Sequence, residues 1–565
     1  MKKIIYGESN FRKVKINSDY LYIDKTLFIE KLENLNESFL VFLRPRRFGK
    51  SLFLSTLQYY YDENSAHEFN KIFADTYIGE NPTPLKSSYR ILFLEFSGIE
   101  VEKGLDFVYD RFGYKVKLKI TSYLKEYNYP KEKIKEIEEI NDPADIIGKF
   151  FEIAQNDKIY LLIDEYDQFA NAILAYSMDD FLKIVGKGGF VRSFYEVLKS
   201  ATQTGTLQKM FITGVTPITL DSLSSGFNIV SNISYHEEFN EMAGFTQEEV
   251  EYSLDNSIFL KCDIDYKDEL LEKIKLWYNG YLFNMNAKNR VYNSTMVNYF
   301  ISQFDYKRCQ MPTKMLDSNV ASDYKAIMKL FNIGDTEKNY KILEQLIKTD
   351  SITGIIKDRY DLNRDFTEDD FITLIYSMGF ITIKDEAFGE VLNFQIPNYV
   401  IKILYFNYFA IEIEKRNSLS IQSSITQILI SLARGDIELF KNQLNEVVKT
   451  LSNRDLMGFD EKYFQVITLS LLSFSSSFYF IDSQPEKDNK YPDILLIGRD
   501  EKVPNNYLFE LKWVKNRDNY DTKKKEGIEQ VKGYLKLDKI KSIPKLKAYL
   551  VIGSKDGVKF ILVQD

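Results

Sequence analysis

The sequence predicts an α/β protein with more than one domain, and three patterns support this. An apolar run at Phe39–Leu43 ends in a basic turn, and Gly49-Lys50-Ser51 then opens a helical pattern. A second apolar run, Lys158–Ile163, ends in adjacent carboxylates. Near the end of the chain, Pro492-Asp493 opens one strand-like run, and Glu510-Leu511-Lys512 lies in the next. With 565 residues, the chain is also too long for a single core.

The first pattern has the layout of a phosphate-binding loop: strand, loop, Gly-Lys-Ser, helix. Backbone amides near Gly49 would bind phosphate, Lys50 would reach the β- and γ-phosphates, and the Ser51 hydroxyl would bind Mg²⁺. The full motif begins with glycine where this chain has Arg44, so the loop alone leaves open a basic turn with solvated arginines. The candidate nucleotide-binding residues here are Arg46, Arg47, Phe48, Gly49, Lys50, Ser51 and Leu52.

The second pattern supplies what such a loop needs. In P-loop ATPases a strand beside the loop ends in an Asp that binds Mg²⁺, and a following Glu polarises the attacking water. Asp164 and Glu165 suit these roles, although an acidic loop after a core strand is common in α/β proteins. A third run, Lys209–Val215, offers Thr213 as a γ-phosphate sensor. With another strand near residue 92, we expect a parallel sheet with ligand at its carboxyl edge.

The middle of the chain, from about Glu237 to Ser420, is rich in helical patterns and tyrosines. One segment follows the order helix, strand, turn, strand, helix, over 369–377, 380–384, a turn at Gly389, 391–396 and 400–408. This order is typical of a winged helix. Because no basic recognition helix is evident, the pattern favours a structural role over DNA binding.

The last part of the chain contains the third pattern. Strand side chains alternate, so Glu510 and Lys512 should share one face, near Asp493 at the start of the preceding strand. Two carboxylates and a lysine there can hold Mg²⁺ or Mn²⁺, and the metal and lysine would stabilise charge on a scissile phosphate. The alternative is a surface hairpin with ordinary solvated charges. Lysines at 523–525 and beyond make this end locally basic, as a phosphate-backbone groove requires.

Several short segments, in order along the chain, carry a resemblance to a known family. They are Tyr22–Thr26, Arg44–Ser51, Leu162–Asp167, Thr213–Val215, Ser225–Asn228, Trp277–Tyr281 and Val291–Asn293. The chain resembles bacterial AAA-ATPase-like proteins with a C-terminal PD-(D/E)xK nuclease-superfamily domain. In that family the loop commonly begins Arg-Pro-Arg-Arg, so Arg44 becomes a marker of the resemblance. Four more residues fall at family positions: Glu461, Glu486, Gln530 and Tyr534.

The patterns and the resemblance together give a domain scheme. We expect an AAA-like P-loop ATPase domain at 1–236, a helical lid with a winged-helix-like region at 237–420, and an α/β restriction-endonuclease-like domain at 421–565. The expected catalytic residues are Glu165, Asp493, Glu510 and Lys512. The expected metal ligands are Ser51, Asp164, Asp493 and Glu510.

The amino-acid composition argues against several classes of protein and of binding site. A net charge of −8 argues against a generally nucleic-acid-coating protein. With only Cys262, Cys309 and two histidines, we expect no disulfide framework, no Cys-rich zinc site and a reducing cytoplasm. The basic start leads into polar residues, so no signal peptide is expected. The uncharged stretch Tyr463–Ile481 contains five serines, which predicts a buried helix running into a loop, not a membrane span.

These observations predict an ATP-binding protein: a Mg²⁺-dependent ATPase coupled to a metal-dependent nuclease acting on DNA or RNA. No membrane partner is expected, and a homo-oligomer is left open. The alternative is a nucleotide switch or scaffold that binds ATP and a partner without nuclease activity.

Overall fold

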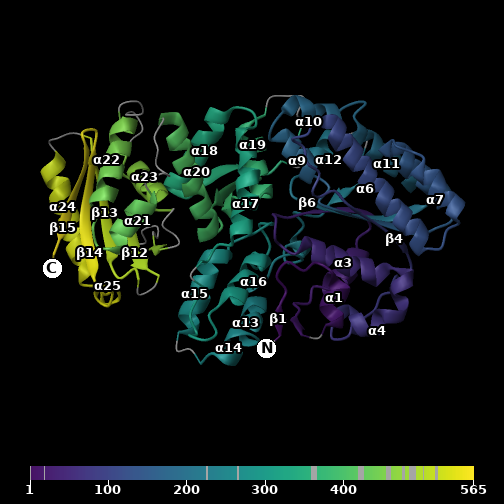
Figure 1. Ribbon diagram of the computed structural model, residues 1–565, viewed down its shortest axis with the longest axis horizontal. Coiled ribbons are helices and arrows are strands. Elements are labelled where there is room, and N and C mark those ends of the chain that lie inside the picture. Colours follow the sequence, from purple (N-terminus) through teal and green to yellow (C-terminus); the bar gives the residue numbers. More distant parts are fainter. Residues whose placement is uncertain are drawn as a thin grey trace. The chain divides into compact units, whose positions relative to one another are not determined.

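A computed structural model covers the chain (Figure 1). It describes residues 2–17, 19–223, 227–263, 266–312, 314–357, 360, 366–417, 425–452, 460–473, 478–482, 492–499, 502–515 and 519–564. The chain divides into two compact units. The first comprises Met1–Pro312, Leu316–Leu346 and Asp350–Tyr399, and the second comprises Thr313–Met315, Ile347–Thr349 and Val400–Asp565. The three-domain scheme with boundaries at 236 and 420 stays a prediction.

The first unit is organised around a five-stranded sheet whose strand order is β4-β5-β6-β3-β7. Every pairing in it is parallel. The strands are β3 (Phe39–Leu43), β4 (Arg90–Glu95), β5 (Ile159–Asp164), β6 (Leu207–Gly214) and β7 (Ser231–Asn232). All of β5 and most of β3 are buried, as expected for parallel strands covered on both faces by helices. The predicted parallel α/β sheet is confirmed.

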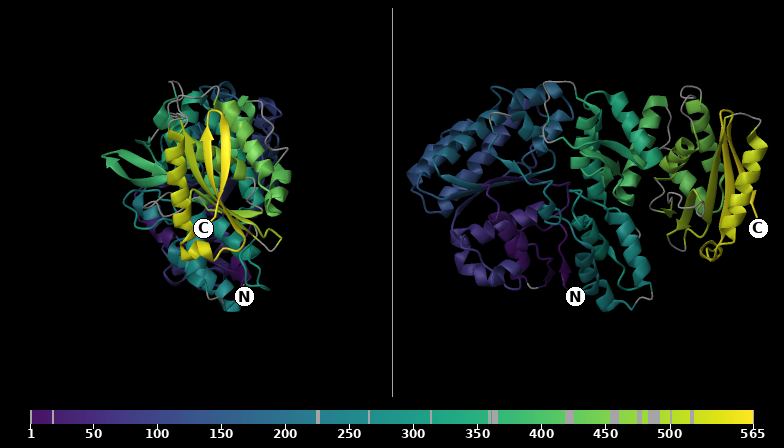
Figure 2. Two further views of the ribbon diagram at one scale, coloured as in Figure 1. Left: turned by 90° about the vertical axis from the view of Figure 1, so that its left-hand side faces the viewer. Right: turned by 180° about the vertical axis from the view of Figure 1, so that it is seen from behind.

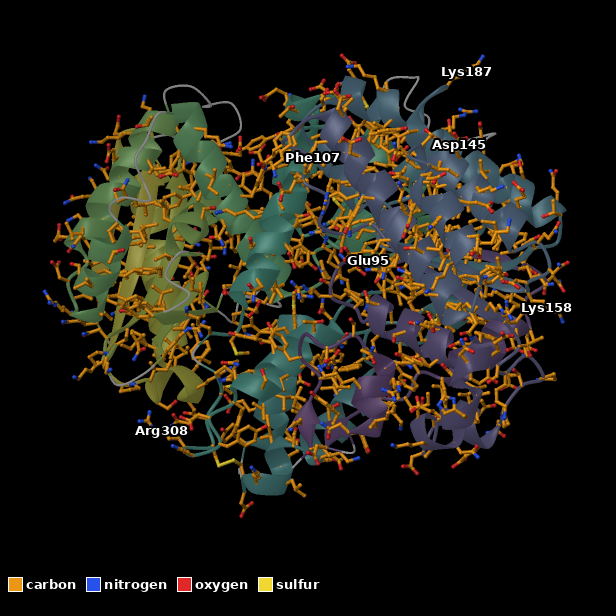
Figure 3. The ribbon with its side chains drawn as sticks, turned by 45° about the vertical axis from the view of Figure 1, so that its right-hand side comes forward. Glu95, Phe107, Asp145, Lys158, Lys187 and Arg308 are labelled. Atoms are coloured by element: carbon orange, nitrogen blue, oxygen red, sulfur yellow. A yellow bond between two sulfur atoms is a disulfide. The ribbon has the colours of Figure 1, made fainter. Side chains whose placement is uncertain are left out.

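The strand order adds a detail that the sequence does not predict. The strand that carries Asp164 does not lie beside the loop strand, because β6 lies between β3 and β5. The chain therefore crosses over the sheet after β5 before β6 takes the place next to β3. Figure 3 labels Lys158, just before β5, and Glu95, at the end of β4 and opposite Asp164. Lys158 therefore lies at the amino edge of the sheet, and Glu95 lies at the carboxyl edge together with Asp164.

Helices connect these strands, as the sequence predicts. The α3 helix (Lys50–Tyr61) follows β3, and three helices, α6 (Leu105–Glu126), α7 (Lys131–Glu138) and α8 (Pro143–Ile153), separate β4 from β5. The α8 helix starts where the sequence signals it, because Asp142 caps the amides of residues 144 and 145 and Pro143 fills the first position. Between β5 and β6 lie α9 (Gln168–Leu174), α10 (Met178–Val185) and α11 (Phe190–Gln203).

The rest of the first unit is mostly helical. A two-stranded parallel sheet near the N-terminus joins β1 (Lys3–Ile4) to β2 (Tyr20–Leu21). The shorter helices are α1 (Phe11–Ile16), α2 (Leu27–Glu33), η1 (Glu63–Glu68), α4 (Phe69–Ile72), α5 (Tyr77–Glu80), α12 (Ile218–Leu223), η3 (Glu237–Phe239), α14 (Ile258–Lys261) and η4 (Met328–Asn332). The longer ones are α13 (Gln247–Asp255), α15 (Lys267–Tyr278), α16 (Ser294–Gln303), α17 (Ser318–Ile327) and α18 (Thr336–Thr349).

The helix-strand-turn-strand-helix segment is present in the predicted order. It consists of α19 (Glu368–Ser377), β9 (Thr382–Phe388), β10 (Val391–Gln395) and α20 (Tyr399–Asn417). A strand that sequence reasoning missed, β8 (Ile352–Ile355), pairs with β10 to give the order β8-β10-β9. The exposed end of the β9–β10 hairpin carries Asp385, Glu386 and Glu390, so this wing is acidic. Acidic side chains there agree with the structural role that the sequence favours.

The second unit holds a mixed five-stranded sheet, yellow to light green in Figure 2. Its strands are β11 (Tyr479–Asp482), β12 (Ile494–Gly498), β13 (Asn506–Val514), β14 (Leu546–Ser554) and β15 (Gly557–Val563), paired in that order. Only β13 and β14 pair in parallel; their connection runs through α24 (Tyr520–Leu535) and α25 (Asp538–Lys541). The other helices after α20 are α21 (Ile425–Ala433), α22 (Glu438–Ser452) and α23 (Glu461–Ser473). The predicted α/β class of this region is confirmed.

The predicted structure of the uncharged stretch Tyr463–Ile481, a buried helix running into a loop, is correct only in part. Its first half is the buried helix α23, as expected. Its end is not a loop, because Tyr479–Asp482 pairs antiparallel with β12. Within the described part of the chain, no helix is both long and apolar enough to cross a membrane.

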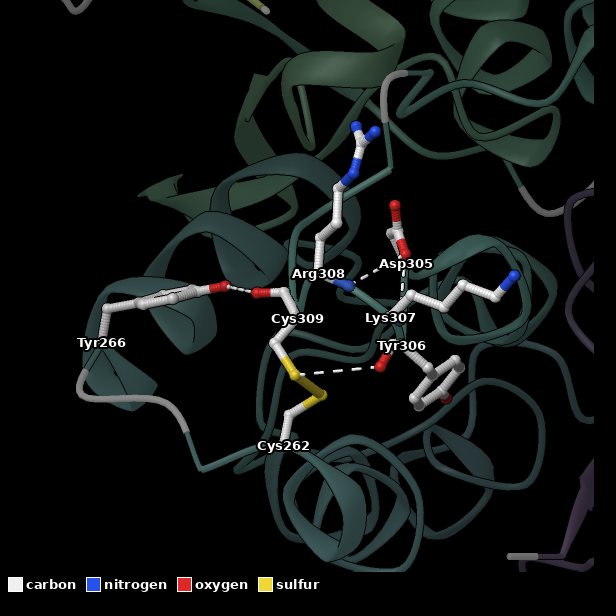
Figure 4. The surroundings of a disulfide bond; sticks show 7 residues. All are labelled: Cys262, Tyr266, Asp305, Tyr306, Lys307, Arg308 and Cys309. Atoms are coloured by element: carbon white, nitrogen blue, oxygen red, sulfur yellow. Dashed lines mark hydrogen bonds between the residues drawn. A yellow bond between two sulfur atoms is a disulfide. The ribbon is translucent and has the colours of Figure 1, made fainter.

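The structure contains one disulfide, which the expectation of no disulfide framework did not anticipate. Cys262, just after α14, is bonded to Cys309 in the turn that follows α16, with Cα atoms 5.7 Å apart (Figure 4). The Tyr266 hydroxyl donates a hydrogen bond to the carbonyl of Cys309. A count of two cysteines could not reveal this bond, because 47 positions separate them and only the fold brings them together. The bond also removes the argument from cysteine content for a reducing compartment.

Candidate functional site

The phosphate-loop motif lies at the turn between β3 and α3. Gly49 is in the left-handed region (φ 91°), which glycine adopts without steric cost, and it places Lys50 at the first position of α3. A cavity of about 430 Å³ opens at this turn. Its lining includes all the predicted loop residues: Arg46, Arg47, Phe48, Gly49, Lys50, Ser51 and Leu52.

The Lys50 side chain is buried and folds back over its own loop. Its Nζ donates to the carbonyls of Arg44 (2.9 Å) and Pro45 (3.0 Å). Burial lowers the pKa of Lys50 to about 8, against the opposing effect of the nearby Glu165 and Asp164 carboxylates. An ammonium group has three N–H donors, so two carbonyl bonds leave one for a phosphate oxygen.

Asp164, Glu165 and Thr213 meet at the carboxyl edge of the sheet. The Thr213 hydroxyl donates to Oδ1 of Asp164 (2.5 Å), which also accepts the amide of Glu165 (3.1 Å). Glu165 has a positive φ of 50°, an uncommon backbone conformation for a side chain of this size. It lines the cavity beside Lys50, and burial, followed by the charge of Asp164, raises its pKa. A carboxylate with a raised pKa is a better proton acceptor.

Arg44, at the start of the loop, is not among the residues that line this cavity and is packed into the protein. Arg44 is 1 % exposed and donates to the carbonyls of Ser234 (2.6 Å) and Phe239 (2.9 Å). Its guanidinium carbon lies 4.4 Å from the ring centroid of Phe42 and 4.0 Å from that of Phe283. Burial lowers the pKa of Arg44. The alternative of a turn with solvated arginines is therefore wrong for Arg44, which ties the loop to residues 234–239.

Sequence reasoning missed two acids near the loop. Asp167 is buried and accepts hydrogen bonds from the amides of Val215 and Thr216, so it fixes the end of β5 to the turn after β6. The run of acids that ends in Asp167 was its only signal. Asp323 on α17 pairs with Arg47. No sequence signal marks Asp323, because 276 residues separate the two partners.

The second predicted site lies where β12 and β13 pair. Lys512 Nζ donates to Oε1 of Glu510 at 2.8 Å, which confirms that both side chains lie on one face of β13. The amide of Leu511 donates to Oδ2 of Asp493 at 2.7 Å. Glu510 and Lys512 are 1 % and 4 % exposed, so the alternative of solvated hairpin charges is wrong.

The family-position residues lie in the same unit. Glu461, at the start of α23, accepts from Lys512 Nζ (3.4 Å) and from the amide of Trp513 (3.2 Å). Gln530 and Tyr534 both lie on α24, as predicted. Glu486 lies outside the described residues. Glu461 therefore holds the end of β13 and adds a further carboxylate to the surroundings of Lys512.

Electrostatics at this site reflect crowded carboxylates. Burial raises the pKa of Asp493 to about 8, and the charge of Glu510 adds to this effect. Burial alone would lower the pKa of Lys512, but the neighbouring Glu510 outweighs it and the pKa is raised. A cation between the carboxylates relieves their mutual repulsion, and Lys512 does so here.

Both sites suit a hard divalent cation with few protein ligands. Among the residues that the structure describes, no three His, Cys, Asp or Glu side chains converge closely enough to hold a metal by themselves. Mg²⁺ binds through one or two carboxylates together with waters and substrate phosphates. The oxygen donors of Ser51 and Asp164 at the loop, and of Asp493 and Glu510 in the second unit, fit that chemistry.

The sheet order, the loop and the acidic strand ends define the first unit as a P-loop NTPase fold. Comparisons with known proteins agree: residues 5–224 match the family model for predicted AAA-ATPases, and residues 459–560 match the model for the PD-(D/E)XK nuclease superfamily. The chain thus joins an AAA-ATPase-like region to a PD-(D/E)XK nuclease-superfamily region, as the resemblance implied.

Individual relatives are distant. A protein of Azotobacter chroococcum mcd 1, described as an uncharacterized protein in the vnfD 5′ region, is 26 % identical over 313 residues. The match spans 52 % of this chain and 50 % of that protein, so the chain covers about half the length of this relative. Among solved structures, a Walker-type ATPase of Pyrococcus abyssi is similar with a TM-score of 0.36 and 12 % identity, over 72 % of this chain and 98 % of that one.

Proposed function

We propose that the first unit is a Mg²⁺-dependent ATPase and that its cycle controls metal-dependent cleavage of nucleic acid by the PD-(D/E)XK region. One observation carries the proposal: Lys50, Asp164, Glu165 and Thr213 converge at the carboxyl ends of three neighbouring strands. A phosphate chain bound at that edge would have a cation, a metal ligand, a base and a polar sensor within reach.

At the loop, amides near Gly49 and the Lys50 ammonium would bind the β- and γ-phosphates, while Ser51 and Asp164 would hold Mg²⁺. Mg²⁺, when bound, neutralises charge on the phosphates. Glu165 would accept the proton of the attacking water, a role that its raised pKa supports. Thr213 would fix the orientation of Asp164 through the hydrogen bond that it donates.

In the second unit, Asp493 and Glu510 would hold Mg²⁺ or Mn²⁺, which supplies an activated water and polarises the phosphate. The Leu511 amide keeps the Asp493 carboxylate in place. Lys512 would move from Glu510 toward the scissile phosphate and stabilise its developing charge. Lysines along and after α24 would bind the nucleic acid backbone.

A second candidate is a nucleotide switch or scaffold, which one observation favours. Lys512 already pairs with Glu510 within the buried site, so this carboxylate is neutralised without a metal ion. A protein of this kind would bind ATP and a partner and cleave nothing.

One experiment separates the two candidates. ATP hydrolysis and cleavage of single- and double-stranded DNA and RNA are measured with Mg²⁺ or Mn²⁺, with and without ATP. Wild type is compared with Lys50→Ala, Glu510→Ala and a control, Glu196→Gln, whose carboxylate pairs with Arg192 on α11 outside the loop cavity. The proposal predicts cleavage that Glu510→Ala abolishes and that ATP alters only when Lys50 is present. ATP binding without cleavage of any substrate would favour the switch.

The domain scheme is proposed with it, and limited proteolysis tests it. Cleavage near residues 237 and 420 would produce three resistant fragments. A single cut near residue 400 would instead support only the two compact units.

A further inference from the structure

The phosphate loop, from Arg44 to Phe48, packs against the middle region of the first unit. Besides the Arg44 bonds, Phe48 packs edge-on against Tyr281, with ring centroids 4.8 Å apart. Pro45 lies against the turn after α19, where a Cβ on Gly379 would be 2.6 Å from Pro45 Cγ. Only a glycine fits there, so the loop and the winged segment are in direct contact.

Arg47 makes the most exposed of these contacts. Its Nε and Nη2 both donate to Oδ2 of Asp323 on α17, at 2.8 and 2.5 Å. Arg46 Nη1 lies 4.0 Å from the other oxygen, Oδ1. The three side chains are 22–34 % exposed and all line the 430 Å³ cavity, together with Gly49, Lys50 and Ser51. Asp323 thus presents a carboxylate to both loop arginines inside the cavity assigned to the nucleotide.

Backbone contacts hold the loop in the same arrangement. Arg47 has a positive φ of 70°, and its carbonyl accepts the amide of Thr295 at 3.2 Å. The Asn293 side chain donates to the carbonyl of Arg46 at 3.3 Å. The guanidinium groups are therefore directed by a fixed backbone, while the Asp323 carboxylate can be replaced by another anion without unfolding the loop.

We propose that Asp323 occupies, in the free protein, the place on Arg46 and Arg47 that phosphate oxygens of a bound nucleoside triphosphate take. This inference rests on the proposed ATP site. A phosphate carries more charge than a carboxylate and forms strong bidentate bonds with guanidinium groups, so it would displace Asp323. Asp323 is then a positioning residue that sets nucleotide affinity and reports occupancy to α17.

Displacement of Asp323 from the loop arginines would be transmitted from α17 to the winged segment through side-chain contacts. Tyr324, the next residue of α17, is buried, and its ring lies edge-on 5.3 Å from that of Phe380. Phe380 directly follows Gly379, which contacts Pro45, and precedes β9. Nucleotide binding would loosen α17 at one end of this contact while Pro45 holds the other. By linkage, any partner that pulls α17 away would strengthen nucleotide binding by the same factor.

The test compares Asp323→Asn with wild type by titration with Mg·ATP and with AMP, which lacks the β- and γ-phosphates. Removal of the competing carboxylate should tighten ATP binding by about two- to fivefold, the range of a partly exposed ion pair, and leave AMP binding unchanged. Asp323→Glu keeps the charge and should bind ATP as wild type does. Glu196→Gln, which removes an arginine-paired carboxylate outside the cavity, should also have no effect.

Hydrogen exchange supplies a readout that a purely structural role would not move. ATP should speed amide exchange over residues 318–327 in wild type, and Asp323→Asn should show fast exchange with or without ATP. Weaker ATP binding by Asp323→Asn would overturn the inference, because Asp323 would then support the ligand or its metal. Unchanged affinity and unchanged exchange would overturn it as well. Wild-type protein that binds no ATP would overturn the proposed function and this inference with it.

Discussion

Lys50 in the first unit and Lys512 in the second are both buried, and they satisfy their charges differently. Lys50 donates to two neutral carbonyls of its own loop, whereas Lys512 is paired with the Glu510 carboxylate. Burial therefore dominates at Lys50 and lowers its pKa, while Glu510 dominates at Lys512 and raises its pKa. A lysine bound to carbonyls is ready for an anionic ligand. A lysine bound to a carboxylate must first give up that partner.

The largest expected effect is at the paired lysine. Lys512→Met should destabilise the second unit by about 3–5 kcal/mol, because Glu510 would remain buried as an uncompensated charge. Urea unfolding followed by tryptophan fluorescence measures this, since Trp513 is adjacent. The double variant Lys512→Met with Glu510→Gln should recover most of the loss. Equal destabilisation of the single and double variants would contradict the pairing.

At the carbonyl-bound lysine, the effect should be on the ligand and not on the fold. Lys50→Ala should weaken ATP binding by about a hundredfold, because charge-assisted hydrogen bonds of this kind contribute roughly 1.5–3 kcal/mol. Its melting temperature should stay within a few degrees of wild type, since only neutral carbonyls lose a partner. Calorimetric titration measures the first and thermal unfolding the second. An undiminished ATP affinity of Lys50→Ala would contradict the assignment of this loop as the phosphate-binding site.

A substitution at Thr213 separates ATP turnover from ATP binding in the first unit. Thr213→Val keeps the shape of the side chain and removes the hydroxyl that donates to Asp164. ATP turnover should fall about tenfold while ATP affinity changes little, because the hydrogen bond of this hydroxyl orients a metal ligand. Steady-state hydrolysis and binding titrations separate the two. Thr202→Val serves as the control, because the Thr202 hydroxyl donates to the carbonyl of Lys199 near the end of α11. This variant should leave ATP turnover and ATP affinity unchanged.

The smallest expected effect is on pH dependence. Because the pKa of Lys50 in the free protein is lowered to about 8, the ammonium form is lost as pH rises through 8. ATP affinity should therefore fall by up to about eightfold between pH 7.5 and 9, at a constant Mg²⁺ concentration. The same titration of Lys50→Ala should be flat over this range. A wild-type profile as flat as that of the variant would show that Lys50 stays protonated.

Much of the architecture could be predicted because local patterns encode it. Apolar runs that end in polar residues gave β3, β5 and β6, and side-chain alternation placed Glu510 and Lys512 on one face. The features that were missed join residues far apart in the chain. Asp323 and Arg47, Cys262 and Cys309, and β8 with β10 each depend on tertiary packing that no local pattern records.

Arg44 shows the same limit. Its departure from the glycine of the usual motif was visible, but the reason was not. The buried partners that explain it, the carbonyls of Ser234 and Phe239, lie about 190 residues further along the chain.

The left-handed backbone at Glu165 restricts which residues evolution can place there. At a φ of 50°, a β-branched residue would strain the chain in addition to losing the carboxylate, whereas Asn or Gly would lose the carboxylate but keep the backbone. In a saturation library, variants at this position should therefore fall into two groups. One group would stay folded and inactive, and the other would also lose abundance. Natural relatives that have abandoned catalysis should carry members of the first group.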